Sequence, residues 1–201
     1  MNIGFFASHN GSNMQAIIDA CNSGILQANP TVVVGNNSKS GALERAKKEG
    51  IACYHISGKH YPDPKELDRV ILNVMIEHLV DIIVLSGYMK KLGPKTLAHF
   101  KGRILNIHPA LLPKYGGKGM YGMNVHEAVI AAGETESGVS IHVVDGNYDT
   151  GQLISQARVP VKISDTPETL AARVLQQEHL LFVETLQKIV TGEITLPIPN
   201  K

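Results

Sequence analysis

Two side chains with complementary chemistry stand two positions apart in the segment Asn106-Ile107-His108. If the segment is extended, both project to one face, because successive side chains of a strand point to opposite sides. The amide of Asn106 can hold a developing oxyanion, and the imidazole of His108 can move a proton near neutral pH. We therefore interpret them as a candidate catalytic pair. Because the chain has nine histidines, a structural role in a turn is the alternative for His108.

A second polar segment, residues 145–151, reads Asp-Gly-Asn-Tyr-Asp-Thr-Gly. Its spacing is similar to that of a calcium-binding loop, but Thr150 replaces the required glycine and Gln156 replaces the required glutamate, which excludes this interpretation. Clusters of this composition are usually solvated turns. If the loop lies near His108, a carboxylate from it can instead orient that histidine or raise its pKa.

A third segment, residues 8–15, lies between an apolar run and a run with helical period. Ser12 is a candidate helix N-cap, and Gln15 three residues later completes a capping box. Such a helix start offers free backbone N–H groups to a phosphate, although a capped connection without a ligand fits these residues equally well. The segment contains neither the dinucleotide-binding glycine pattern nor a P-loop.

Short β-rich runs must position these three loops, and most of them alternate with helical segments. The predicted strands are 2–7, 31–35, 52–56, 81–86, 103–107, 138–144 and 152–161, and the predicted helices are 12–22, 42–49, 65–78, 94–100 and about 166–190. This alternation predicts an α/β fold, with an open, mostly parallel, twisted sheet of about seven strands and helices on both faces. Because the last two strands follow each other across residues 145–151, we expect one antiparallel strand late in this Rossmann-like sheet. Ligands of such sheets bind beyond the carboxyl ends of the strands.

The composition excludes several classes of function. A chain of 201 residues suits one domain with a substantial core. Its 19 basic and 18 acidic residues, with only 5% aromatic residues, provide neither a basic surface nor a stacking platform for nucleic acid. Cys21 and Cys53 are too few for a disulfide framework. No secretory or membrane-spanning run is evident, so we expect a cytoplasmic protein without membrane or nucleic-acid partners.

Taken together, the loops resemble those of the phosphoribosylglycinamide formyltransferases, which are folate-dependent enzymes of purine synthesis. The resemblance runs from Met1 to about Val190. The segment around His108 is typical of the wider formyltransferase group. Its combination with the segment 10–13 indicates the phosphoribosylglycinamide formyltransferases within that group. The matching segments are Asn10-Gly11-Ser12-Asn13, Gly87-Tyr88-Met89, the run from Ile104 to Lys114, Tyr148-Asp149-Thr150-Gly151 and Gln177-Glu178-His179.

The resemblance implies a reaction and a catalytic set. The formyl group of 10-formyltetrahydrofolate would pass to the amine of 5-phosphoribosylglycinamide by direct attack through a tetrahedral intermediate, with no metal. Asn106 would stabilise the oxyanion, His108 would shuttle protons, and Asp149 would tune His108. A histidine working near neutral pH suits this chemistry. His142, which alternates with apolar residues on a predicted strand, is either a satisfied core residue or a partner of this site.

The resemblance also implies binding residues for the two substrates. The phosphate would lie on Gly11, Ser12 and Asn13, the ribose hydroxyls on Glu178, and the folate against Met89, Lys90, Lys91 and Leu92 together with backbone of residues 144–149. The sequence departs from the usual pattern in two places. Residues 116–122 form an unusual glycine-rich loop, and Pro64 occupies the position of a basic residue that contacts the folate tail, for which Lys65 is the expected substitute.

Three alternative functions remain to be compared with this interpretation. A 10-formyltetrahydrofolate hydrolase or another formyltransferase shares the catalytic core, but we expect a single catalytic domain at 1–190 and a tail at 191–201, without the additional domains of those enzymes. A non-catalytic nucleotide-binding module has no need of Asn106, His108 and Asp149 together. A metal-dependent hydrolase using His108, His142 and Asp149 lacks a usual ligand spacing.

Either a monomer or a homodimer is expected. Five histidines are assigned to the surface: His55, His60, His78, His99 and His126.

Overall fold

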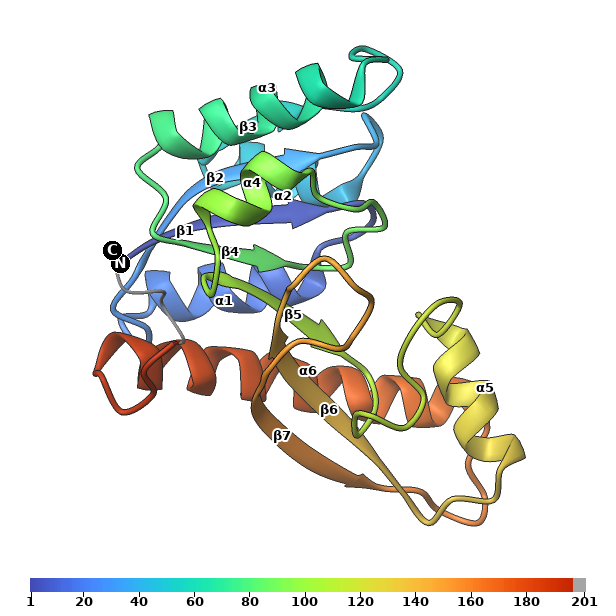
Figure 1. The fold of residues 1–201 in the computed structure, drawn as a ribbon. Coiled ribbons are helices and arrows are strands. Elements are labelled where there is room, and N and C mark those ends of the chain that lie inside the picture. The colour runs from blue at the N-terminus through green and yellow to red at the C-terminus, as the bar shows by residue number, and fades with distance from the viewer. Residues whose placement is uncertain (197–201) are drawn as a thin grey trace.

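Seven strands form one sheet in the order β3-β2-β1-β4-β5-β6-β7 in the computed structural model, which describes residues 1–196 (Figure 1). The strands are β1 (Asn2–Ala7), β2 (Asn29–Gly35), β3 (Ala52–His55), β4 (Ile82–Leu85), β5 (Ile104–His108), β6 (Glu136–Val143) and β7 (Leu153–Pro160). Strands β1 to β5 pair in parallel, whereas β6 is antiparallel to both β5 and β7. The predicted mostly parallel sheet with one reversed strand is confirmed.

Helices cover both faces of the sheet (Figure 1). One layer contains α1 (Ser12–Asn22), α2 (Gly41–Lys48), α5 (Met123–Ala131) and α6 (Pro167–Val190), and the other contains α3 (Pro64–Glu77) and α4 (Pro94–His99). The alternation along β1 explains the two cores, because Phe5 packs into the first layer and Phe6 into the second, each with 0% of its surface exposed. The central strand β4, which is covered on both faces, is accordingly apolar from Ile82 to Leu85.

The topology opens a crevice between β1 and β4. After β1 the chain passes to β2 on one side, and it later returns to β4 on the other side, so the connections at the carboxyl ends of β1 and β4 diverge. Ser8, just after β1, accepts a 2.7 Å hydrogen bond from the backbone N–H of Met89, just after β4. The three polar segments predicted from the sequence all border this region.

The structure corrects two local predictions near this edge. Ser12 is not the N-cap of α1, because Gly11 takes a left-handed conformation (φ 66°) and the helix begins at Ser12 itself. The Gln15 side chain donates to Asp19 and Glu49 instead of closing a capping box. Helix α5 was not predicted, since its entry at Gly122 has no capping side chain and so gives no helix-start signal.

The chain packs against the core at both ends of α6 and as far as Leu196. The predicted start of α6 is confirmed, because Thr166 and Thr169 form a reciprocal capping box. Leu196 is 7% exposed and belongs to the core that contains α6, so part of the predicted 191–201 tail is packed. Its last five residues lie outside the described part. Within residues 1–196, no helix combines the length and apolar character needed to cross a membrane.

A buried carboxylate joins α3 to α4, and its removal provides a test of this packing. Asp68 is 3% exposed and accepts hydrogen bonds from the backbone N–H groups of Lys95 and Thr96 and from the Thr96 hydroxyl. We expect Asp68→Ala to lower the free energy of unfolding by about 3 kcal/mol, because buried donors lose a charged acceptor. The exposed N-cap variant Asp63→Ala should lose only about 1 kcal/mol. Urea denaturation measures both, and equal losses would contradict the assignment.

Candidate active site

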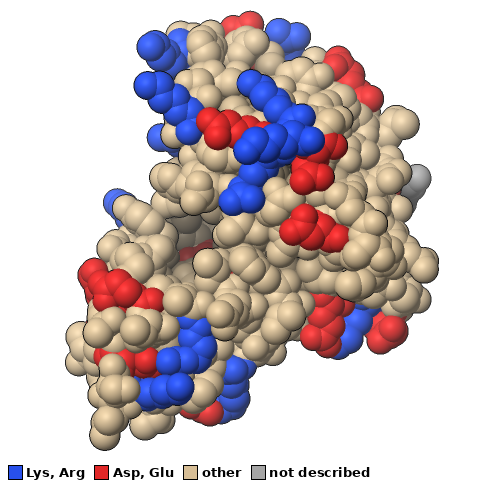
Figure 2. Space-filling view, turned by 180° about the vertical axis from the view of Figure 1, so that it is seen from behind, with Lys and Arg blue, Asp and Glu red and all other residues tan. Residues whose placement is uncertain are grey.

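A cleft of about 820 Å³ lies at the carboxyl edge of the sheet, bordered by α5, α6 and the connections after β4 and β5. Figure 2 shows a hollow in the surface of one face of the molecule. Lys and Arg side chains are interspersed with Asp and Glu side chains on that face. The cleft brings together groups that are far apart in the sequence. The predicted site residues that line it are Asn13, Met89, Lys90, Asn106, His108, Asp149 and Glu178.

A second, narrower pocket of about 90 Å³ adjoins the cleft on the side of β4 and α4. Its walls are partly apolar and include Leu92, Leu97 and Val144. Asn106 and Asp149 line both cavities. The cavities also share Tyr88, Lys90 and Tyr148, so a group in the narrow pocket and a group in the cleft would meet along a common wall that includes Asn106 and Asp149.

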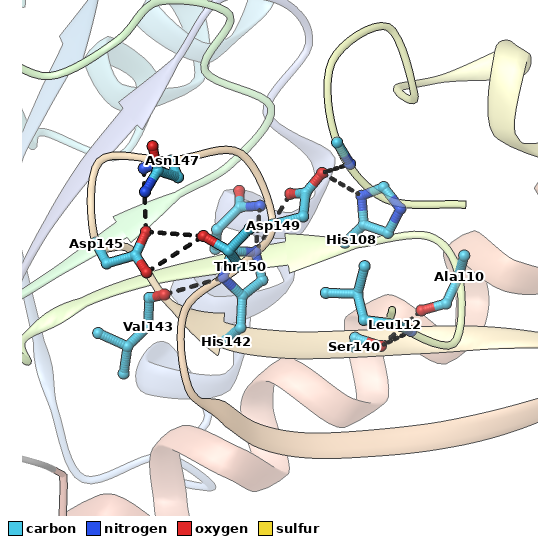
Figure 3. Close-up of polar contacts among 12 residues, drawn as sticks. His108, Ala110, Leu112, Ser140, His142, Val143, Asp145, Asn147, Asp149 and Thr150 are labelled. Carbon is cyan, nitrogen blue, oxygen red and sulfur yellow. Dashed lines mark hydrogen bonds and ion pairs between the residues drawn. The ribbon is translucent and has the colours of Figure 1, made fainter. Parts of the chain in front are cut away.

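The carboxylate of Asp149 is the centre of the polar contacts at this meeting point (Figure 3). Its Oδ2 lies 3.6 Å from Nδ1 of His108 and accepts a 2.9 Å hydrogen bond from the backbone N–H of Gly117. Its Oδ1 lies 3.4 Å from Nε2 of His142. Burial raises the pKa of Asp149, but the His142 ring and the Gly117 amide more than compensate, so its pKa is lowered and it remains ionised.

His108 is 3% exposed, and both of its ring nitrogens have neighbours. Nε2 lies 2.7 Å from the carbonyl oxygen of Tyr115, so Nε2–H donates to that carbonyl. In the neutral ring Nδ1 is then the unprotonated nitrogen, and it faces Asp149. Burial lowers the pKa of His108, although the Asp149 charge and the Tyr115 carbonyl act to raise it. The geometry provides a base whose protonated form is stabilised by a carboxylate beside the proton.

His142 connects this group to Asn106. The two residues are register partners across β5 and β6, and Nδ2 of Asn106 lies 3.1 Å from Nε2 of His142. Nδ1–H of His142 donates to the carbonyl of Val143, and Nε2 faces both the amide of Asn106 and Oδ1 of Asp149. Of the two predictions made for His142, the structure supports a partner of the site.

The loop that carries Asp149, residues 144–152 between β6 and β7, is held in shape by its own contacts. Asp145 accepts hydrogen bonds from the backbone N–H of Asn147 and from the hydroxyl of Thr150 (Figure 3). A side chain at Gly151 would place Cβ 1.7 Å from the carbonyl oxygen of Val143, so only glycine fits there. The backbone of Asp149 itself is left-handed, with φ 57°. Such strained residues concentrate at functional sites.

At the start of α1, two backbone N–H groups have no partner within the described residues; of Gly11, Ser12 and Asn13, only Asn13 lines the cleft. The described residues 1–196 supply no hydrogen-bond acceptor to the N–H groups of Ser12 and Asn13. A Cβ at Gly11 would come within 2.8 Å of Ala42, so both packing and the positive φ require glycine. A helix start with free N–H groups is a favourable position for an anion.

Glu178 on α6 contacts Asn13 of α1 directly, and both residues line the cleft. Nδ2 of Asn13 donates a 2.8 Å hydrogen bond to Oε2 of Glu178, whereas Oδ1 of Asn13 is buried without a partner. Burial raises the pKa of Glu178 to about 7, and the Asn13 amide offsets only part of this effect. Two buried polar groups with unused capacity therefore face the cleft together.

Comparison with known proteins identifies the family. The model of the formyl transferase family, described as "Formyl transferase", matches residues 1–186. The chain belongs to the formyl transferase family. The chain is 42% identical over 190 residues to the chloroplastic phosphoribosylglycinamide formyltransferase of Vigna unguiculata, and it spans 61% of that protein's length. It is 36% identical over 196 residues to phosphoribosylglycinamide formyltransferase of Escherichia coli, with 98% of this chain and 90% of that protein covered.

A solved structure agrees with the fold of this formyl transferase. The glycinamide ribonucleotide transformylase 1 of Symbiobacterium toebii superimposes with a TM-score of 0.90 at 32% identity, covering 98% of this chain and 90% of that chain. In the formyl transferase described here, no cluster of three His, Cys, Asp or Glu side chains among residues 1–196 is arranged to hold a metal ion.

Only some of the remaining predicted binding residues of this formyl transferase line the two cavities. Lys90, Lys91 and the buried Leu92 line the narrow pocket, and the Lys91 ammonium lies 4.8 Å from the ring centre of Tyr148. Lys65 is exposed at the start of α3 and lines neither the cleft nor the narrow pocket. Its predicted contact with a folate tail stays a prediction.

One histidine assigned to the surface from the sequence is in fact buried. His126 is 4% exposed and lines the cleft, because it lies on the unpredicted helix α5. The spacing of Val125 and Val129 is the signal that can reveal this helix, since both are buried against the layer that contains α6.

The raised pKa of Glu178 gives a pH-dependent stability. The folded pKa of about 7 exceeds the ordinary value of 4.5, so the buried carboxylate destabilises the fold progressively as pH rises through this window. We expect Glu178→Gln to be more stable than the wild type by roughly 3 kcal/mol at pH 8, and the difference should vanish near pH 4. Denaturation at both pH values measures it, with exposed Glu184→Gln as the control on the same helix. A pH-independent difference would contradict the assignment.

Proposed function

We propose that this formyl transferase transfers the formyl group of 10-formyltetrahydrofolate to the amine of 5-phosphoribosylglycinamide, in purine biosynthesis. The observation that carries the proposal is the junction of two cavities at Asn106 and Asp149, because a reaction between two substrates needs two adjoining sites. The names of the relatives at 36–42% identity support the same reaction. We also propose that the protein is located in the cytoplasm.

The two cavities suit the two substrates by their chemistry. The phosphate binds at the N–H groups of residues 11–13, and the ribose hydroxyls bind Glu178, whose oxygens can accept two hydrogen bonds. The flat pterin ring occupies the narrow pocket, between Leu92 and backbone of the 144–149 loop. The folate supplies the electrophilic formyl carbon at the junction. Met89, Lys90 and Lys91 border its path outward.

The polar groups at the junction support the chemical step. Asn106 donates its amide N–H to the oxygen that becomes negatively charged when the amine attacks. His108 takes a proton from the attacking amine and returns it to the departing folate nitrogen. Asp149 stabilises the protonated ring, from which it is 3.6 Å away. All of these groups are provided by the protein, and no covalent intermediate with the protein is required.

An assay with and without the ribonucleotide separates transfer from hydrolysis. We expect the protein to consume 10-formyltetrahydrofolate without added metal only when 5-phosphoribosylglycinamide is present. His108→Ala should reduce kcat by about a hundredfold or more, because general acid-base catalysis is lost. Equal folate turnover without the amine would favour the hydrolase, and a His108→Ala variant with near wild-type activity would exclude the mechanism.

The charge of Asp149 has a separate, spectroscopic test. This carboxylate acts to raise the His108 pKa against the burial that lowers it, so Asp149→Asn should move the His108 titration to lower pH. NMR of histidine ring protons measures the titration, and kcat should fall by about a hundredfold. Asp145→Asn is the matched control, since Asp145 contacts only its own loop. An unchanged His108 titration would contradict the tuning role.

A further inference from the structure

His126 is a buried ring in the cleft to which neither the catalytic group nor the binding groups above assign a role. It is 4% exposed, and its Nδ1 has no hydrogen-bond partner among residues 1–196. Leaving a buried polar atom unpaired is unfavourable, so such atoms in folded proteins call for a reason. A leucine at this position of α5 would pack without that cost.

The position of the ring is fixed by the packing of α5. Val125 and Val129 are buried in the core that also contains α6, which orients the helix and turns His126 toward the cleft. His108 and Glu178 line the same cleft, and the charge of His108 is close enough to lower the His126 pKa in addition to the effect of burial. His126 therefore shares one cleft with the proposed base and with the proposed ribose-binding carboxylate.

The unpaired nitrogen determines what the ring can do. Buried N–H groups without an acceptor are rarer than acceptors without a donor, so the neutral ring keeps Nδ1 unprotonated and carries its proton on Nε2. Nδ1 is enclosed, and Nε2 is the nitrogen left to meet the cleft. A neutral donor there adds no positive charge that would keep a nearby amine substrate from binding.

We infer that His126 is a substrate-binding residue whose Nε2–H donates a hydrogen bond to the amide carbonyl of the ribonucleotide, between its ribose and its reacting amine. The inference rests on the proposed function, since that function places the ribose at Glu178 and the amine at His108. The hydrogen bond fixes the arm that carries the nucleophile. Glu178 and the start of α1 hold the other end of the same substrate.

Three substitutions test the inference by the position of the donor. His126→Gln keeps an N–H near the Nε2 position, His126→Asn moves it to the Nδ1 position, and His126→Leu keeps only the bulk. We expect Leu and Asn to raise KM for 5-phosphoribosylglycinamide by about three- to tenfold, and Gln to stay within about twofold of wild type. KM for the folate should not change in any variant. Thermal melting verifies that all three fold.

Ribose 5-phosphate provides the matched ligand, because it lacks the amide. Its inhibition constant should be the same for wild type and His126→Leu if His126 contacts the carbonyl. Equal weakening of ribose 5-phosphate and of the ribonucleotide, or equal KM values in all variants, would overturn the inference while leaving the reaction intact. A wild-type protein that does not transfer the formyl group to the ribonucleotide would overturn the proposed function, and the inference with it.

Discussion

One carboxylate with three partners holds the site together. The side chain of Asp149 is 11% exposed, and it contacts two histidine rings and a backbone amide of the 116–122 loop. Charges interact strongly where little water is present, so this carboxylate both orders the glycine-rich loop and stabilises a proton on His108. Asn106 depends on it indirectly, because His142 lies between the two side chains. The junction of the two cavities is built around this group.

The two residues that contact the His108 ring, Tyr115 and Asp149, both have a left-handed backbone conformation. Tyr115, whose carbonyl accepts the Nε2 proton, has φ 56°, and Asp149 has φ 57°. Left-handed conformations of residues other than glycine are unfavourable and persist only where surrounding contacts enforce them. The Tyr115 hydroxyl supplies one such contact, a 2.9 Å hydrogen bond to Glu134. The imidazole is thus fixed between two strained backbones, which restricts its rotation and keeps Nδ1 directed at the carboxylate.

Local sequence patterns predict the fold class and the pair Asn106 and His108, because the alternation of side chains along a strand is a short-range property. Asn106 and His108 were found two residues apart on one strand, and that spacing is visible in the sequence. His126 was assigned to the surface because its burial depends on a helix without a capping signal, packed against α6 much later in the chain. The start of α1 was misread for a related reason. Serine competes well for N-cap positions, but the left-handed turn at Gly11 depends on close contact with Ala42.

The pairing of Asn106 with His142 makes the site dependent on strand alignment. These residues meet only because β5 and β6 pair in one antiparallel register, in which Leu105 faces Val143 and Ile107 faces Ile141. A shift of one residue would turn His142 to the opposite face of the sheet. A one-residue insertion or deletion within β6 is therefore as severe for this group as loss of the histidine itself. Insertions and deletions can therefore be tolerated in the loops around the cleft, whereas the number of residues in β6 must stay the same.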